Sequence, residues 1–81
     1  MKLNNFELLE LKEKLAFVKH FGVFLTERNY YNLIIKLFQV DSYYVEVFTF
    51  KDDGKVLLIQ TFNNTEDLDP YLATIDITSV A

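Results

Sequence analysis

Two strand-like runs joined by a turn constrain this chain more than any other part of its sequence. Residues 43–62 read YYVEVFTF, then KDDG, then KVLLIQTF. Both runs are rich in the β-branched and aromatic residues that favour strands. An Asp-Gly pair between two such runs is among the strongest short-range signals for a β-hairpin. We therefore expect the rest of the chain to cover this hairpin or to extend it.

The length of the hairpin loop decides which side chains share a face of the sheet. A two-residue loop of Asp53 and Gly54 would mix polar and apolar residues on both faces. A three-residue loop that begins at Asp52, with Gly54 in the left-handed conformation, sorts them better, and we predict that register. It pairs Glu46 with Gln60. One face then carries Tyr44, Phe48, Phe50, Val56, Leu58 and Phe62.

The pattern of residues 4–21 predicts one long amphipathic helix. Asn4 is a suitable N-cap, and Glu7 follows three residues later, as in a capping box. An apolar stripe recurs at helical spacing, and Gly22 is a natural stop. We expect this helix to cover the sheet face described above. The stripe consists of Leu8, Leu11, Leu15 and Val18.

A third strand is predicted at residues 30–39, where side chains alternate between two faces. Asp41 and Ser42 suit a tight turn into the hairpin. Residues 23–29 have no clean period and are interpreted as a connection, in which residues 23–25 pack under the end of the helix and residues 26–29 are polar. Asp69 followed by Pro70 predicts a short helix that ends near residue 76. The predicted fold class is α+β, with a long N-terminal helix on a three-stranded antiparallel meander and a short C-terminal helix.

Composition narrows the classes of protein to consider. A chain of 81 residues fits a single domain over residues 1–81 and contains no cysteine, so neither a disulfide framework nor a thiolate metal site is expected. Charged residues interrupt the N-terminal segment before it reaches signal-peptide length, and no run is long enough to span a bilayer, so we expect a cytoplasmic protein without a membrane partner. The net charge of −4 and the single arginine disfavour nucleic acid as a partner.

Four short motifs are spread over a segment that makes up about three quarters of the chain. They are GxFL at 22–25, RxYY at 28–31, YVEV at 44–47 and PYLxxIDI at 70–77. Together they resemble a family of short uncharacterised bacterial proteins built as a helix followed by antiparallel strands. The resemblance implies a bacterial cytosolic protein, and it supplies neither an activity nor a catalytic residue.

Few residues are candidates for chemistry, and we predict no catalytic residue, metal site or cofactor. His20, the only histidine, has no plainly paired nucleophile and suits the C-terminal end of a helix. The acidic segment 66–69 suits a solvated helix N-terminus better than a calcium loop. Glu46 lies in an otherwise apolar strand and needs a partner if it is buried. Arg28 could supply a bidentate one, and a structural ion pair is favoured over a ligand-binding pair.

The second face of the predicted sheet leads to the functional hypothesis. One helix can cover only one face, and each large apolar side chain left in water forgoes roughly 1.5–3 kcal/mol. We therefore predict a non-enzymatic interaction module that pairs through the second face, most simply as a homodimer. Alternatives are an acidic partner or inhibitor of another protein, and a small ligand-binding domain that uses Arg28 and Glu46. The second face would hold Tyr43, Val45, Val47, Ile34, Phe38, Leu57 and Ile59.

Overall fold

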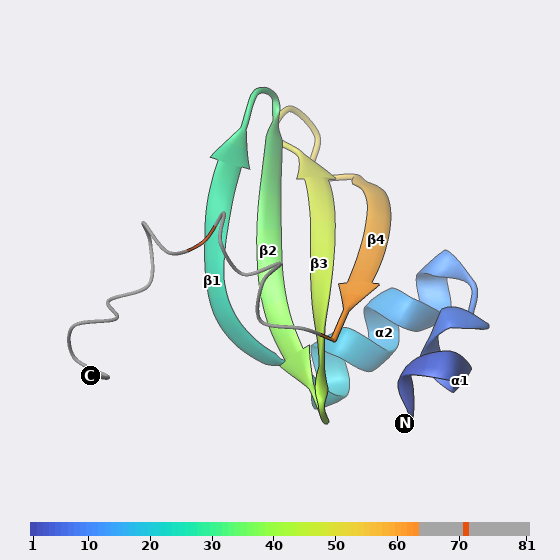
Figure 1. Cartoon of the computed structure of the whole chain (residues 1–81). Helices are drawn as coiled ribbons and strands as arrows, with labels where there is room; N and C mark the ends of the chain where they lie inside the picture. Colours follow the sequence, from blue (N-terminus) through green and yellow to red (C-terminus); the bar gives the residue numbers. More distant parts are fainter. Residues whose placement is uncertain (64–70, 72–81) are drawn as a thin grey trace, which may run out of the picture.

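The computed structural model, which describes residues 1–63 and Tyr71, consists of two short helices followed by a four-stranded sheet (Figure 1). Each strand pairs antiparallel with the next one along the chain, so the sheet is a meander with β1 and β4 at its edges. This arrangement confirms the α+β class and the antiparallel sheet. The elements are α1 (Leu3–Glu7), α2 (Leu11–Phe21), β1 (Val23–Tyr30), β2 (Leu33–Val40), β3 (Tyr43–Phe50) and β4 (Val56–Phe62).

The single long helix predicted for residues 4–21 is wrong, because the chain breaks between α1 and α2. Glu10 has extended backbone angles and is the N-cap of α2. Its backbone N–H donates to Oε1 of Glu13 at 3.1 Å, the contact made in one half of a capping box. The predicted N-cap, Asn4, lies inside α1. The break turns Leu8 out to solvent, while Phe6 on α1 and Val18 on α2 both enter the core.

The segment 23–29, interpreted as a connection, is part of a fourth strand, β1. Its pairing with β2 shifts register between Phe24 and Thr26, so Leu25 is at a β-bulge. A bulge adds one residue and interrupts the two-residue alternation by which strands are recognised in a sequence. This is the physical reason why the segment shows no clean period.

The turns that join the strands agree in part with the prediction. Asp41 and Ser42 separate β2 from β3 as expected, and Asp41 has a φ of +50°. Glu46 pairs with Gln60, and Gly54 has a φ of +72°, both as predicted. The hairpin loop is one residue longer than predicted, because the backbone N–H of Phe50 donates to the carbonyl oxygen of Lys55 at 2.9 Å.

A register shift next to this loop moves Val56 to the other side of the sheet. The shift lies between Phe48 and Thr49, and it pairs Thr49 with Val56. Directly paired residues in an antiparallel sheet share a face. Val56 therefore lies on the face of Val47 rather than on the predicted face of Phe48, and it packs against the core there.

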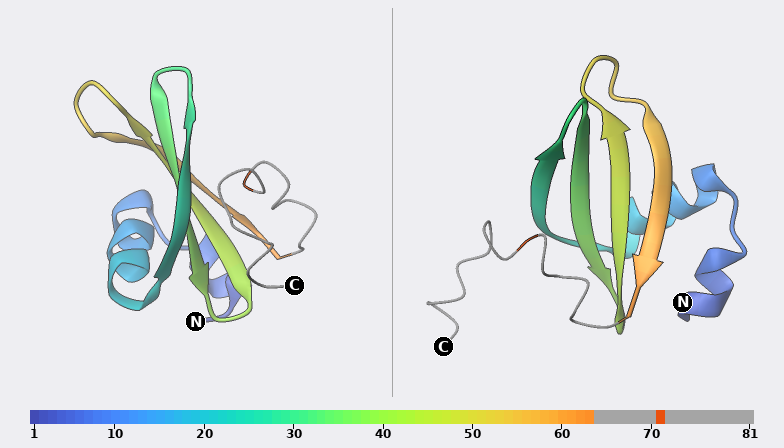
Figure 2. Two further views of the ribbon diagram at one scale, coloured as in Figure 1. Left: turned by 90° about the vertical axis from the view of Figure 1, so that its left-hand side faces the viewer. Right: turned by 45° about the horizontal axis from the view of Figure 1, so that its top comes forward.

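The helices cover the opposite face from the one predicted. Figure 2 shows α2 against one side of the sheet, beside the half that lies away from the β1–β2 and β3–β4 loops. We call this side the helix face; its buried residues Tyr43, Val45 and Val47 form a core with Phe6 and Val18. A connection was predicted at residues 23–29, between the helix and the sheet, but β1 begins directly after α2.

Gly22 allows this tight passage from α2 into β1. A Cβ atom at Gly22 would lie 2.6 Å from the carbonyl oxygen of Val18, closer than such contacts occur. Its φ of −78° is accessible to any residue. Gly22 therefore ends the helix as predicted, but it does so through close approach rather than a left-handed cap.

The other side of the sheet, which we call the far face, has a core of its own. Ile35, Leu37, Phe62 and Tyr71 pack together there, and none of these four residues is more than 9% exposed. The ring of Tyr44 stacks on that of Phe62 at a centroid distance of 5.2 Å. The short helix predicted to end near residue 76 lies outside the described residues, apart from Tyr71.

Candidate functional site

The residues predicted to form an interface are mostly interior. Tyr43, Val45 and Val47 are buried beneath the helices, and Phe38 and Ile59 pack against the same core. Ile34 is half-buried on the helix face, and Leu57 is exposed beside the register shift of β4. The predicted self-association surface is thus corrected: α1 and α2, rather than a second molecule, cover most of it.

The predicted pair of Arg28 and Glu46 is present on the far face. Arg28 is in β1 and Glu46 is in β3, and β2 lies between these two strands. Nη2 of Arg28 lies 3.7 Å from Oε2 of Glu46, and the two side chains are 23% and 12% exposed. This single contact is an ion pair, but it lacks the bidentate geometry that the sequence analysis considered.

Tyr71 completes this polar cluster. Its hydroxyl donates a 2.5 Å hydrogen bond to Oε2 of Glu46, and the guanidinium carbon of Arg28 lies 5.1 Å from the centre of its ring. Burial raises the pKa of the Tyr71 phenol, and the hydrogen bond to Glu46 raises it further. Tyr71 was not predicted as a partner of Glu46. One feature of the sequence could have indicated such a partner: a buried carboxylate at Glu46 requires a hydrogen-bond donor.

The contacts of this cluster suit an anchor that holds Tyr71 against the sheet. One oxygen of Glu46 serves both Tyr71 and Arg28. Among the described residues, Nε of Arg28 is buried and has no hydrogen-bond partner. Because the carboxylate already has two partners, its clearest role is to hold Tyr71 on the far face.

The remaining candidates for chemistry are dispersed. His20 is exposed in the last turn of α2, and its ring contacts that of Phe21 at a centroid distance of 5.3 Å. Within residues 1–63 and Tyr71, no group of three or more His, Asp or Glu side chains could hold a metal ion. The acidic segment 66–69 lies outside this part of the chain. No helix in the described part is long and apolar enough to cross a membrane.

An apolar surface does occur at the junction of α2 and β1. Phe21, Val23, Phe24 and Leu25 are between 40% and 63% exposed, and we call these four residues the β1 patch. Two of its rings pack on other aromatic rings. The distance between ring centres is 4.8 Å for Phe21 and Phe17, and 5.6 Å for Phe24 and Phe38. This surface was not predicted, because residues 23–25 were expected to pack under the helix end, whereas all three are exposed.

Comparisons with protein-family models, with curated proteins and with solved structures found no match to this chain. The resemblance to short bacterial proteins therefore stays a prediction.

Proposed function

We propose that this protein is a non-enzymatic interaction module that self-associates through the β1 patch, most simply as a two-fold dimer. The observation that supports this proposal is a run of exposed apolar residues that wraps around the edge of the sheet, with Phe24 paired to Phe38 on the helix face and Val23 paired to Gln39 on the far face. Isolated exposed apolar residues are normal, whereas contiguous ones mark interaction surfaces. The patch also lies at an edge of the sheet, where a second molecule has access.

Charge at the two ends of the patch favours a second copy as the partner. Lys19 and His20 precede the patch in the last turn of α2, and Glu27 follows it in β1. A two-fold axis through the patch would run the two copies antiparallel. The basic end of one copy would then face the acidic end of the other, which makes the surface complementary to itself.

The contact we propose is made by side chains rather than by a continuous strand ladder. The bulge at Leu25 distorts the edge of β1, and Glu27 and Arg28 place charges further along it. Both features discourage edge-to-edge strand pairing. The half-exposed side chains of two patches would contribute roughly 6–12 kcal/mol in total when buried. Association itself costs about 4 kcal/mol or more, so we expect a dissociation constant in the micromolar range or weaker.

Light scattering coupled to size-exclusion chromatography, at protein concentrations from a few micromolar to several hundred micromolar, tests this proposal. We expect the mass to rise from monomer to dimer over this range. Val23→Glu places a charge in the patch at an exposed position and should keep the protein monomeric throughout. Leu8→Glu is the matched control, because Leu8 is 84% exposed and lies between α1 and α2, away from β1.

Two results would contradict the proposal. One is a wild-type protein that stays monomeric at several hundred micromolar. The other is an equal loss of dimer in Leu8→Glu and Val23→Glu, which would show that added negative charge, rather than the patch, controls association.

A further inference from the structure

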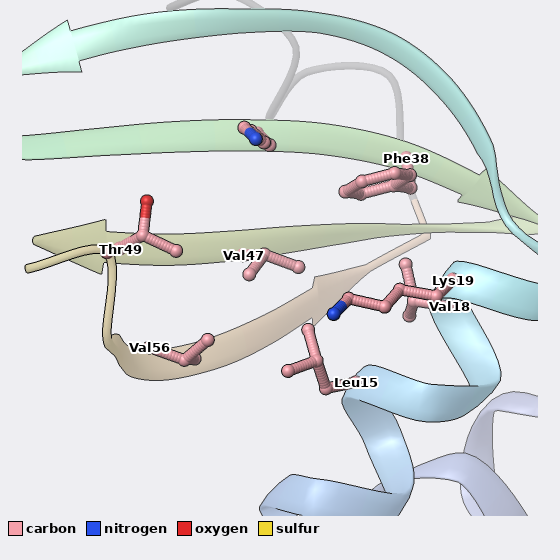
Figure 3. Close-up of a pocket in the computed structure, with 9 residues that line it drawn as sticks. Leu15, Val18, Lys19, Phe38, Val47, Thr49 and Val56 are labelled. Carbon is pink, nitrogen blue, oxygen red and sulfur yellow. The ribbon is translucent and has the colours of Figure 1, made fainter. Parts of the chain in front are cut away.

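A pocket of about 230 Å³ lies between α2 and the helix face of the sheet (Figure 3). It forms where α2 stops covering the face, toward the end that bears the β3–β4 hairpin loop. No residue of the β1 patch lines it, but Lys19, which lies at the basic end of that patch, does, so the two features share this one side chain. Its lining residues are Leu15, Val18, Lys19, Lys36, Phe38, Val47, Thr49, Gly54 and Val56.

The floor of the pocket is apolar. Val18 and Val47 are buried, and Leu15, Phe38 and Val56 are partly buried around them. Val56 belongs to this floor because of the register shift in the β3–β4 hairpin. An apolar cavity of about 150 Å³ is enough to admit benzene. The pocket therefore has room for one ring, or for a short alkyl chain, together with a small polar group.

Two lysines give the pocket a positive charge. Lys19 comes from α2 and extends into the pocket in Figure 3, and Lys36 comes from β2. Neither lysine forms an ion pair with another residue of the described part of the chain. Glu27 lies opposite Lys36 in the β1–β2 register but does not line the pocket. Two cations thus face a concave apolar surface, and none of the lining residues in the described part of the chain is acidic, in a protein whose net charge is −4.

We propose that this pocket binds a small amphiphilic carboxylate, either a single aromatic ring or a short alkyl chain that ends in a carboxylate group. The apolar floor takes the ring or chain, and the ammonium groups of Lys19 and Lys36 bind the carboxylate. A sugar or a sugar phosphate fits less well, because its hydroxyl groups would lose their hydrogen bonds to water against this floor. Thr49 offers little to such a ligand, since its hydroxyl donates to the backbone oxygen of Ile34 at 3.2 Å.

Titration of the ¹⁵N-labelled protein with octanoate, followed by two-dimensional NMR, tests the site. We expect saturable shifts of the backbone amides of the lining residues, with those of α1 unmoved. Octanamide has the same chain without the charge and should bind at least about fivefold more weakly, as expected when a partly exposed ion pair is lost. Inorganic phosphate has charge without a chain and should cause no saturable shift.

Substitution of the lysines shows whether octanoate binds in the pocket or is attracted to positive charge anywhere on the protein. Lys19→Met and Lys36→Met keep an unbranched apolar stem and should each weaken octanoate binding about fivefold. Lys12→Met removes the same charge from an exposed position of α2 outside the pocket and should leave the affinity unchanged. The spectra of the variants also show whether each one is folded. The proposal is overturned by the absence of saturable shifts at millimolar octanoate, by equal binding of octanamide, or by equal weakening in Lys12→Met.

Discussion

The two faces of this sheet are both apolar, but they are closed in different ways. On the helix face, Phe6 and Val18 pack on Val45 and its neighbours, and no charged residue among those described is buried in this core. On the far face, the core of Ile35, Leu37 and Phe62 adjoins the ion pair of Arg28 and Glu46. Its cover in the described residues is Tyr71, which binds Glu46 through its hydroxyl.

The two faces therefore differ in how specific their contacts are. Apolar packing, which is non-directional, dominates the helix face, and hydrogen bonds from Tyr43 to the backbone oxygen of Met1 and from Thr61 to Glu7 add direction at its margin. A hydrogen bond to a carboxylate requires a particular donor at a particular place. The far face therefore specifies which side chain lies on it, and it also becomes sensitive to pH.

Removal of the main contact of α1 should lower the free energy of unfolding more than any other change proposed below. The ring of Phe6 is fully buried and lies 5.9 Å from Phe17 and 5.8 Å from Tyr43, between ring centres. We expect Phe6→Ala to lower the free energy of unfolding by about 3–5 kcal/mol, as measured by urea denaturation. Leu8→Ala, at a strongly exposed position, should change it by less than about 0.5 kcal/mol. A loss of under about 1 kcal/mol for Phe6→Ala would mean that α1 contributes little to the closure of this face.

On the far face, Tyr71→Phe should lower the free energy of unfolding by a smaller amount. This change keeps the ring but removes the hydroxyl that donates to Glu46, and a hydrogen bond to a charged group contributes about 1.5–3 kcal/mol. Urea denaturation measures the loss, and Tyr31→Phe, at an exposed ring, serves as the control.

A double-mutant cycle with Glu46→Gln shows whether the two residues act together. We expect Glu46→Gln to be destabilising, and its effect to couple with that of Tyr71→Phe by at least about 0.5 kcal/mol. A rise in stability for Glu46→Gln would contradict the anchor role, because it would show that the carboxylate is held there at a cost to stability.

The comparison of the faces also explains how far the sequence could predict the fold. The hairpin at 43–62 follows from local chemistry, since Asp53 and Gly54 suit a tight turn between strand-forming runs. The register changes at Leu25 and next to Thr49 depend on tertiary packing and leave no pattern in the sequence. Because a one-residue slip exchanges the faces of a strand, these shifts were enough to hide β1 and to misplace Val56.

The candidate site shows the same limit. A single arginine and one acidic residue in an apolar strand were sufficient to predict the pair of Arg28 and Glu46. Tyr71 lies 25 positions beyond Glu46 in the chain, so no local spacing connects the two residues. The β1 patch and the lysine-lined pocket depend on where α2 ends relative to the sheet, which is a property of the assembled fold.

The smallest expected effect is a change of the free energy of unfolding with pH that arises from Tyr71 on the far face. Burial, and then the hydrogen bond to Glu46, raise the pKa of Tyr71 above the value of about 10 for an unfolded chain. The folded state therefore holds this proton more tightly. The stability it contributes is complete below pH 10 and is lost as the pH rises above 10 toward the folded-state pKa.

Urea denaturation of the wild type and Tyr71→Phe between pH 8 and pH 11 isolates this contribution. The wild type should lose stability above pH 10 more steeply than the variant, so the difference between them should narrow as the pH rises. Part of the slope should persist in Tyr71→Phe, because burial and the nearby charge of Asp41 also raise the pKa of Tyr43. A constant difference across this range would show that Tyr71 ionises in the folded protein as it does in an unfolded chain, and the polar closure of the far face would then lack the pH sensitivity inferred for it.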